Sequence, residues 1–358
     1  CIRDSARPPL AMDGELNRLH VEALGAISRL AVAGVMVPSA GWFLYGFVRK
    51  EAVITSQIEG TQATLEDVVT FEATDEAANP DDVLEVCNYV DALSYARREL
   101  SRPSGLPLST RLLCEAHKRL MRGARGANKL PGQVRRSQNW IGGSRPGNAS
   151  FVPPPPEDVP ACMAELERWL HAPDSLPPLV RAGLAHVQFE TIHPFLDGNG
   201  RIGRLLIALL IEHWGLLPQP LLYVSVAIRR RQQEYYTRLS AVREGDWEGW
   251  TAFYLECVRD AAEDGVNAAR RLFSLVGTDR AKLLAHAGVN VPALRLFDAL
   301  PAQPVVTLAA AVKMLGVSKP TAIKAIASLE SVGILRETSG RQRDRVYAYR
   351  SYLARLSD

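Results

Sequence analysis

The feature that most constrains this chain of 358 residues is one polar loop between two apolar helical runs, at residues 179–189 and 202–214. Glycines let such a loop turn its backbone N–H groups toward one point. The next helix begins with unpaired N–H donors and the positive end of its dipole. The sequence therefore predicts an anion site here. The loop and the helical turn that follows it read His193, Pro194, Phe195, Leu196, Asp197, Gly198, Asn199, Gly200, Arg201, Ile202, Gly203 and Arg204.

Four side chains of this segment suit phosphate chemistry. Arg201 and Arg204 are three residues apart, so both can reach one phosphate group from the first helical turn. Asp197 can hold a magnesium ion that bridges phosphates, and His193 can take a proton from an incoming hydroxyl group. Each residue alone is weak evidence, because a lone histidine usually packs and Gly-Asn-Gly is usually a turn. Together they predict a nucleotide phosphate site with a base beside it.

The twelve positions match H-x-F-x-(D/E)-G-N-G-R-x-x-R at every defined position, and the chain therefore resembles the Fic family. The resemblance covers about residues 50–260. It implies a mainly α-helical core with a β-hairpin flap, and a protein adenylyltransferase that moves AMP from ATP to a Tyr, Thr or Ser hydroxyl of a target protein or of itself. The implied site has His193 as the catalytic base, Asp197 as the ligand of a Mg²⁺ cofactor, and Gly198, Asn199, Gly200, Arg201 and Arg204 as the ATP phosphate-binding residues.

A second segment resembles an inhibitory helix of the same family. The apolar pattern predicts a helix over residues 46–58, with Gly60 just after its end. Glu59 then faces the negative end of the helix dipole, which costs about 0.3–1 kcal/mol unless a buried arginine compensates. Residues 55–60 match (S/T)-x-x-x-E-(G/N). The resemblance implies that Glu59, with Thr55 on the same helix, pairs with Arg204 and keeps it from the ATP γ-phosphate. It also implies that Glu59 positions water for removal of AMP.

Residues 132–156 lack a helical period and are rich in glycine and proline. They predict a β-hairpin with strands near residues 134–141 and 149–152. In the Fic family a hairpin flap aligns the target segment by main-chain pairing, which would make Ser150, Phe151 and Val152 the flap residues. The alternative is a plain surface hairpin before a polyproline connector.

Two tyrosines on a helical run, Tyr235 and Tyr236, correspond to residues that line the adenine pocket in related Fic proteins. Some relatives also contact the base with an asparagine seven positions later, where this chain has Arg243. As a bare pattern, two tyrosines on a helix more often belong to the core.

Residues 285–358 predict a separate winged helix-turn-helix, with helices at 307–315 and 319–333 and strands at 334–337 and 345–349. This layout suits entry into a major groove with phosphate contacts, and it equally suits dimerisation or protein contact. DNA and a second copy of the chain are therefore open partners. The outward residues would be Ser318, Lys319, Thr321 and Lys324 on the second helix and Arg341, Arg343 and Arg345 on the wing.

Composition bounds the remaining possibilities. A net charge of +3 does not by itself indicate nucleic acid or membrane. We expect a cytoplasmic protein with no membrane partner, because no run has the length of a membrane helix and no signal peptide is visible. Without a C-x-x-C pair, free thiols are expected of the five cysteines. These are Cys1, Cys87, Cys114, Cys162 and Cys257.

The predicted organisation is an N-terminal helical region at 1–110 with the inhibitory helix at about 46–60, a Fic core at 111–275, and the winged helix at 285–358. Gly200 favours AMP transfer, because a lysine at that position marks the Doc-like branch, which acts as a kinase. Two alternatives remain open. One is the same fold with another nucleotide donor, such as UTP or CDP-choline. The other is a DNA-binding transcriptional regulator whose Fic core modifies itself.

Overall fold

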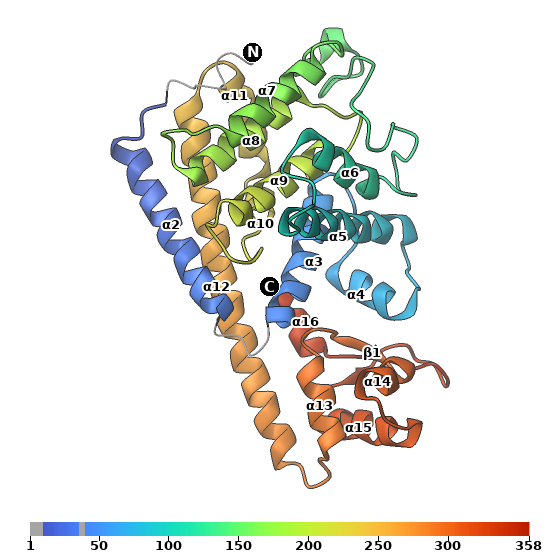
Figure 1. The fold of residues 1–358 in the computed structure, drawn as a ribbon. Coiled ribbons are helices and arrows are strands. Elements are labelled where there is room, and N and C mark those ends of the chain that lie inside the picture. The colour runs from blue at the N-terminus through green and yellow to red at the C-terminus, as the bar shows by residue number, and fades with distance from the viewer. Residues whose placement is uncertain (1–9, 36–39, 358) are drawn as a thin grey trace.

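The computed structural model describes residues 10–35 and 40–357, and it confirms a mainly α-helical fold with one small sheet (Figure 1). Cys1 lies outside the described residues. The helices before the C-terminal unit are α2 (Gly14–Val35), α3 (Ala40–Ile58), α4 (Leu65–Thr74), α5 (Pro80–Ser101), α6 (Thr110–Leu120), α7 (Val159–His171), α8 (Pro178–Ile192), α9 (Asn199–His213), α10 (Ser225–Arg230), α11 (Gln232–Arg243) and α12 (Trp247–Ala285), with a short 3₁₀ turn at Pro146–Asn148.

Helices α8 and α9 form the centre of the molecule. Every residue of α8 from Leu179 to Ile192 is buried, and α9 is buried from Ile202 through Ile211. A helix that is apolar on nearly all faces must be surrounded by other elements. Helix α9 packs against α8, α5, α3 and α6, while α7 and α12 cover α8. The loop between α8 and α9, which carries the motif, is therefore fixed at both ends by the core.

Helix α12 is 39 residues long and joins the core to the C-terminal unit. Helix α2 packs along it through an apolar stripe that includes Leu19, Ala23, Ile27 and Leu30. Figure 1 shows α2 beside the upper part of α12, while the lower part runs on to the C-terminal unit. The helix is continuous across residue 275, which was the predicted C-terminal boundary of the core.

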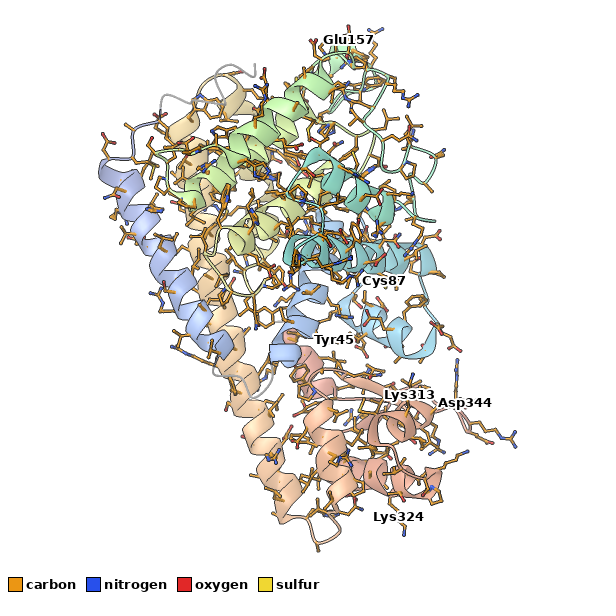
Figure 2. All side chains as sticks on the ribbon, viewed as in Figure 1. Tyr45, Cys87, Glu157, Lys313, Lys324 and Asp344 are labelled. Atoms are coloured by element: carbon orange, nitrogen blue, oxygen red, sulfur yellow. The ribbon has the colours of Figure 1, made fainter. Side chains whose placement is uncertain are left out.

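The C-terminal unit carries a three-stranded antiparallel sheet in the order β1-β3-β2, with Val306 opposite Tyr347 and Glu337 opposite Tyr347 on its other side. Two helices, α14 and α15, follow the first strand. Lys324 on α15 lies at the outer end of the unit (Figure 2). The elements are α13 (Val291–Ala299), β1 (Val305–Thr307), α14 (Leu308–Leu315), α15 (Lys319–Ser331), β2 (Arg336–Glu337), β3 (Val346–Ala348) and α16 (Arg350–Ser357).

This unit is fastened to the N-terminal helices. Arg341, which lies between β2 and β3, donates to Glu76 over 3.0 Å, and Arg350 on α16 donates to Glu66 on α4 over 3.3 Å. Leu356 packs so tightly on Gly46 of α3 that a Cβ atom there would lie 2.5 Å from Leu356 Cδ2. Two of the three wing arginines predicted to face outward are therefore engaged within the chain, because Arg345 Nε also donates to the Arg341 carbonyl over 3.0 Å.

The predicted pair of regular strands at 134–141 and 149–152 is wrong. Pairing is limited to one bridge, in which the Ile141 N–H donates to the Phe151 carbonyl over 2.9 Å. Gly142 and Gly143 follow at once with φ of +70° and +69°, which ends the ladder. The preceding residues bond instead to the motif loop, since the Arg135 N–H donates to the Pro194 carbonyl over 2.9 Å.

Two further expectations concern thiols and membranes. The four described cysteines, Cys87, Cys114, Cys162 and Cys257, form no disulfide. In the part of the chain that the structure describes, none of the helices combines the length and the apolarity that crossing a bilayer requires.

The close contact of α8 with α12 gives a stability prediction. A Cβ atom on Gly183 would lie 2.5 Å from the ring of Tyr254, whereas one on Gly277 would meet nothing within 4 Å. Gly183→Ala should therefore lower the free energy of unfolding by about 1–3 kcal/mol. The matched change Gly277→Ala should raise the free energy of unfolding by up to about 1 kcal/mol, because alanine favours the helix more than glycine does. Urea titration measures both, and equal effects would contradict this packing.

Candidate active site

A cavity of about 730 Å³ opens beside the motif loop. Four segments enclose it: the end of α3, the segment around the Ile141–Phe151 bridge, the α8–α9 junction, and α11. It brings together residues that are far apart in the sequence. Its lining includes Glu59, Trp140, Ile141, Ser150, Phe151, Glu190, His193, Gly200, Arg204, Gln233, Tyr235, Tyr236, Thr237, Leu239, Ser240 and Arg243.

His193 ends α8 in a backbone conformation that non-glycine residues seldom adopt, with φ of +50°. Two hydrogen bonds of its backbone hold it there. The His193 N–H donates to the Phe189 carbonyl over 2.9 Å, and Arg135 Nε donates to the His193 carbonyl over 2.9 Å. Arg135 is itself 1% exposed and was not predicted from the sequence. Burial lowers the pKa of His193 to about 4, so the imidazole is neutral at pH 7 and can accept a proton.

The loop is braced from inside by Asn199. Its Oδ1 accepts from the Phe195 N–H over 2.8 Å, and its Nδ2 donates to the Phe195 carbonyl over 2.8 Å. Asn199 was expected to bind phosphate, but its side chain is turned into the loop and buried, so only its backbone can take that role. Gly198, with φ of +76°, lets the chain turn into α9 directly behind it.

Arg204 is held by the end of α3. Its Nη2 donates to Glu59 Oε1 over 2.6 Å and to the Thr55 carbonyl over 3.0 Å, and its Nε donates to Thr55 Oγ1 over 2.7 Å. Burial acts to raise the pKa of Glu59, but the pairing with Arg204 outweighs it and the net shift is downward. The Arg204 side chain is 2% exposed and the Glu59 side chain 34%, so the guanidinium is desolvated while the carboxylate still meets solvent.

Two glycines make this pairing fit. Gly60, at φ of +97°, ends α3 in a Schellman arrangement, in which its N–H donates to the Gln57 carbonyl and the Thr61 N–H donates to the Ser56 carbonyl. Glu59 then packs directly on Gly200, where a Cβ atom would lie 2.2 Å from Glu59 Oε1. A side chain at position 200 would displace Glu59.

The other motif arginine has a different environment. Arg201 does not line the cavity; its Nη1 donates to Glu85 Oε2 on α5 over 3.1 Å. Glu85 also accepts from Arg125 Nε over 2.6 Å and from Thr61 Oγ1 over 2.9 Å. Neither Glu85 nor Arg125 was predicted as a site residue from the sequence. Glu85 was detectable, because it precedes the buried Tyr89 by four residues and so lies on the inward face of its helix.

Asp197 carries the single carboxylate of the motif. Its side chain is 44% exposed, it is not among the residues that line the cavity, and its Oδ1 lies 3.6 Å from Arg201 Nη2. Its Oδ1 accepts from the Gly198 N–H over 2.6 Å. Among the described residues, no group of three or more His, Cys, Asp or Glu side chains is placed to hold a metal ion. Magnesium is commonly held by one or two carboxylates together with substrate phosphates and waters. Asp197 therefore fits an ion that arrives with a nucleotide, and it does not fit a resident ion.

His117 supports the backbone of the same loop. Its Nδ1 accepts from the Gly132 N–H over 2.8 Å, so its Nε2 carries the proton and donates to the Asp197 carbonyl over 3.0 Å. The ring stacks on Phe195 with centroids 3.9 Å apart. These contacts fix the backbone of Asp197.

The two predicted pocket tyrosines differ. Tyr235 is buried and its hydroxyl is hydrogen-bonded to His186 Nε2 at 2.9 Å, whereas Tyr236 is 44% exposed. Both line the cavity. Arg243 lines it as well, and its guanidinium stacks on the Phe151 ring at 3.6 Å.

Of the predicted flap residues, Ser150 and Phe151 line the cavity, while Val152 is 44% exposed and does not. Glu190 is among the lining residues that were not predicted from the sequence. Glu190 is a lone carboxylate in a buried helix, three residues before His193. That isolation within an apolar run was the available indication in the sequence.

Comparison with known proteins identifies the family to which these residues are similar. Residues 17–98 match the family model described as Fic/DOC family N-terminal, and residues 107–211 match the model described as Fic/DOC family. The chain therefore contains a Fic/DOC family domain preceded by the N-terminal region of that family.

Among curated relatives, the protein adenylyltransferase Fic of Drosophila yakuba is 38% identical over 129 residues, and that of Drosophila melanogaster is 37% identical over the same length. Each match covers 35% of this chain and 23% of the relative, so the chain spans about a quarter of the length of these relatives.

Among solved structures, a Fic family protein from Desulfovibrio desulfuricans G20 superposes with a TM-score of 0.61 at 25% identity, covering 96% of this chain and 98% of that one. A Fic domain containing signaling protein from Bacteroides thetaiotaomicron has a TM-score of 0.58 at 19% identity, covering 70% of this chain and 97% of that one, and this second likeness shows the fold alone.

The lowered pKa of Glu59 gives a pH prediction. A carboxylate whose pKa is lower in the folded chain contributes stability above its ordinary pKa of about 4.3 and loses it as the pH falls through the lowered value. Glu59→Gln should therefore destabilise the chain at pH 7, and the difference from the unchanged chain should shrink below pH about 4. Urea titrations across pH measure this.

The exposed pair Arg29–Glu263 offers the control Glu263→Gln, for which the difference in the free energy of unfolding should stay small at every pH. A difference for Glu59→Gln that grows in acid would contradict the pairing.

Proposed function

We propose that this chain is a protein adenylyltransferase that moves AMP from ATP to a hydroxyl group of a target protein or of itself, and that Glu59 holds it inactive. The observation that carries the proposal is the contact of Arg204 with Glu59 and Thr55 in the cavity that also contains His193. The Fic adenylyltransferases to which residues of this chain are similar support the same activity.

The proposed transfer uses the neutral imidazole of His193 as the base. The target hydroxyl loses its proton to His193 while its oxygen bonds to the α-phosphorus, and pyrophosphate leaves. The protein mainly positions the groups and stabilises charge. The Gly198 to Gly200 backbone at the start of α9 offers N–H donors to phosphate oxygens. Tyr235 and Tyr236, in the wall formed by α11, would contact the adenine, and Ser150 and Phe151 would align the target segment.

Asp197 is the residue that would hold Mg²⁺ together with the phosphates of ATP. The ion supplies charge neutralisation for the phosphate groups. His117 and Gly198 keep the backbone and the carboxylate of Asp197 in place for this role.

The inhibition is a competition for one guanidinium group. Arg204 makes its hydrogen bonds with Glu59 and Thr55 instead of with the γ-phosphate. Nucleotide can enter the cavity in this state, but the γ-phosphate lacks its cation. The same carboxylate, held beside the site by Arg204, would position a water molecule for removal of AMP.

Two further points of function depend on separate features. The alternative is another nucleotide donor, such as UTP or CDP-choline, and Arg243 in the cavity wall stands where some relatives have an asparagine that contacts the base. We interpret the C-terminal unit as a winged helix. Its exposed residues Lys319, Lys324 and Arg343 are available to DNA, whereas Arg341 is paired with Glu76. A thermal-shift panel of nucleotides and a gel shift with genomic fragments test these points.

Releasing Arg204 should activate the chain. Glu59→Gly removes the competing carboxylate, and we expect self-labelling from α-³²P-ATP to rise on the order of a hundredfold, comparable to the effect of one charge-stabilising donor. Label from γ-³²P-ATP should remain absent, because AMP and not phosphate is transferred. Label from the γ position would turn the assignment toward a kinase.

Removing the base should abolish the reaction. His193→Ala in the Glu59→Gly chain should lower the labelling rate by roughly 10²–10⁴-fold, the usual contribution of a general base. His213→Ala, at the far end of α9, is the matched control and should leave the rate unchanged. If His193→Ala transferred AMP at the parent rate, His193 would not be the base.

A further inference from the structure

The carboxyl group of Glu190 in the cavity wall has no part in the chemistry described so far. Glu190 lies on the last turn of α8 and is 5% exposed. Its Oε2 lies 3.8 Å from His193 Nδ1. Among the described residues, neither His193 Nδ1 nor Glu190 Oε1 is within hydrogen-bond geometry of a partner. The Glu190 backbone carbonyl lies close enough to raise the pKa of His193, so it competes with the carboxylate as an acceptor for Nδ1–H. A buried carboxyl group thus faces the one nitrogen of the base that points away from solvent.

Packing fixes the place of this group. Its Oε1 lies against Gly203 of α9, where a Cβ atom would be 2.5 Å from the oxygen and 3.1 Å from His186 Nδ1. His186 is itself held by the hydroxyl of Tyr235, and burial lowers its pKa to about 4, so it is neutral. Only a glycine at position 203 leaves room for the Glu190 carboxyl group.

Charges on three surrounding elements act on it. Burial raises the pKa of Glu190 to about 7; Arg204 and Arg243 act to lower it, and Glu59 acts to raise it. Near neutral pH the group is therefore divided between its acid and its carboxylate. Loss of the charge of Glu59 favours the carboxylate, because the two arginines remain.

We propose that Glu190 is a positioning residue for His193, whose carboxylate accepts the Nδ1–H of His193 and thereby directs Nε2 to the target hydroxyl and stabilises the imidazolium that forms. This inference rests on the proposed function. The hydroxyl proton goes to Nε2 as the oxygen–phosphorus bond forms and the bond to pyrophosphate breaks, and it later leaves to solvent. Glu190 takes no proton from the substrate. The 3.8 Å separation exceeds a hydrogen bond by about 1 Å, and such contacts often shorten only when substrate binds.

The rate test uses the Glu59→Gly chain as its parent. Glu190→Gln keeps the shape beside Gly203, and we expect it to lower kcat at least about tenfold while KM for ATP stays within about twofold. The parent rate should rise with pH as Glu190 ionises, with a midpoint below about 7 because the charge of Glu59 is gone. Glu190→Gln should lose this rise.

The control is Glu212→Gln, which breaks a 2.7 Å ion pair with Arg97 at the other end of α9. It should keep both the rate and the pH profile of the parent.

A second measurement does not depend on activity. In the chain with Glu59 present, the NMR signals of the His193 imidazole should show an inflection near pH 7 as Glu190 ionises, and Glu190→Gln should remove it. An inflection that persists in Glu190→Gln overturns the inference, as does an unchanged rate and pH profile. If the Glu59→Gly chain transfers no AMP, the proposed function fails, and the His193 titration still decides whether Glu190 acts on this imidazole.

Discussion

The buried guanidinium of Arg204 is the group on which the rest of the site depends. A cation that is 2% exposed must have partners, and the end of α3 supplies both an acidic oxygen and two oxygens of Thr55. That requirement fixes where α3 ends, and it requires a glycine at position 200 so that Glu59 can approach. The contact of Glu59 and Thr55 with Arg204 is therefore built from the same packing that stabilises the core, and any anion that competes for Arg204 must offer equivalent contacts.

The loop beside Arg204 owes its shape to residues that do not face the cavity. Asn199 holds the Phe195 backbone, Arg135 holds the His193 carbonyl, and His117 holds the Asp197 carbonyl. These side chains satisfy backbone groups that would otherwise be buried without partners. The result is a rigid frame in which His193 keeps an uncommon backbone conformation without freedom to relax.

The sequence predicted the parts of this protein that depend on local pattern. It placed the motif between two helices and the end of α3 at Gly60, and the family resemblance implied the pairing of Glu59 with Arg204. It failed where distant segments decide. Residues 134–141 do not form a regular strand, because Arg135 bonds to the motif loop. The Asn199 side chain turns inward, because the Phe195 backbone needs it. The sequence indicates that Glu85 and Glu190 lie in buried positions of their helices, but it does not reveal their neighbours, because Arg125, Arg201 and Arg204 lie on other elements.

The central claim is that Glu59 withholds Arg204 from the γ-phosphate, and the most direct measurement compares the affinities of ATP and ADP by calorimetry. In the unchanged chain, the two nucleotides should bind within about twofold of each other, since the γ-phosphate gains no charge-assisted contact. In Glu59→Gly, ATP should bind about tenfold more tightly than ADP, which corresponds to one hydrogen bond to a charged group. An unchanged chain that already prefers ATP, or a Glu59→Gly chain with no preference, would contradict the account.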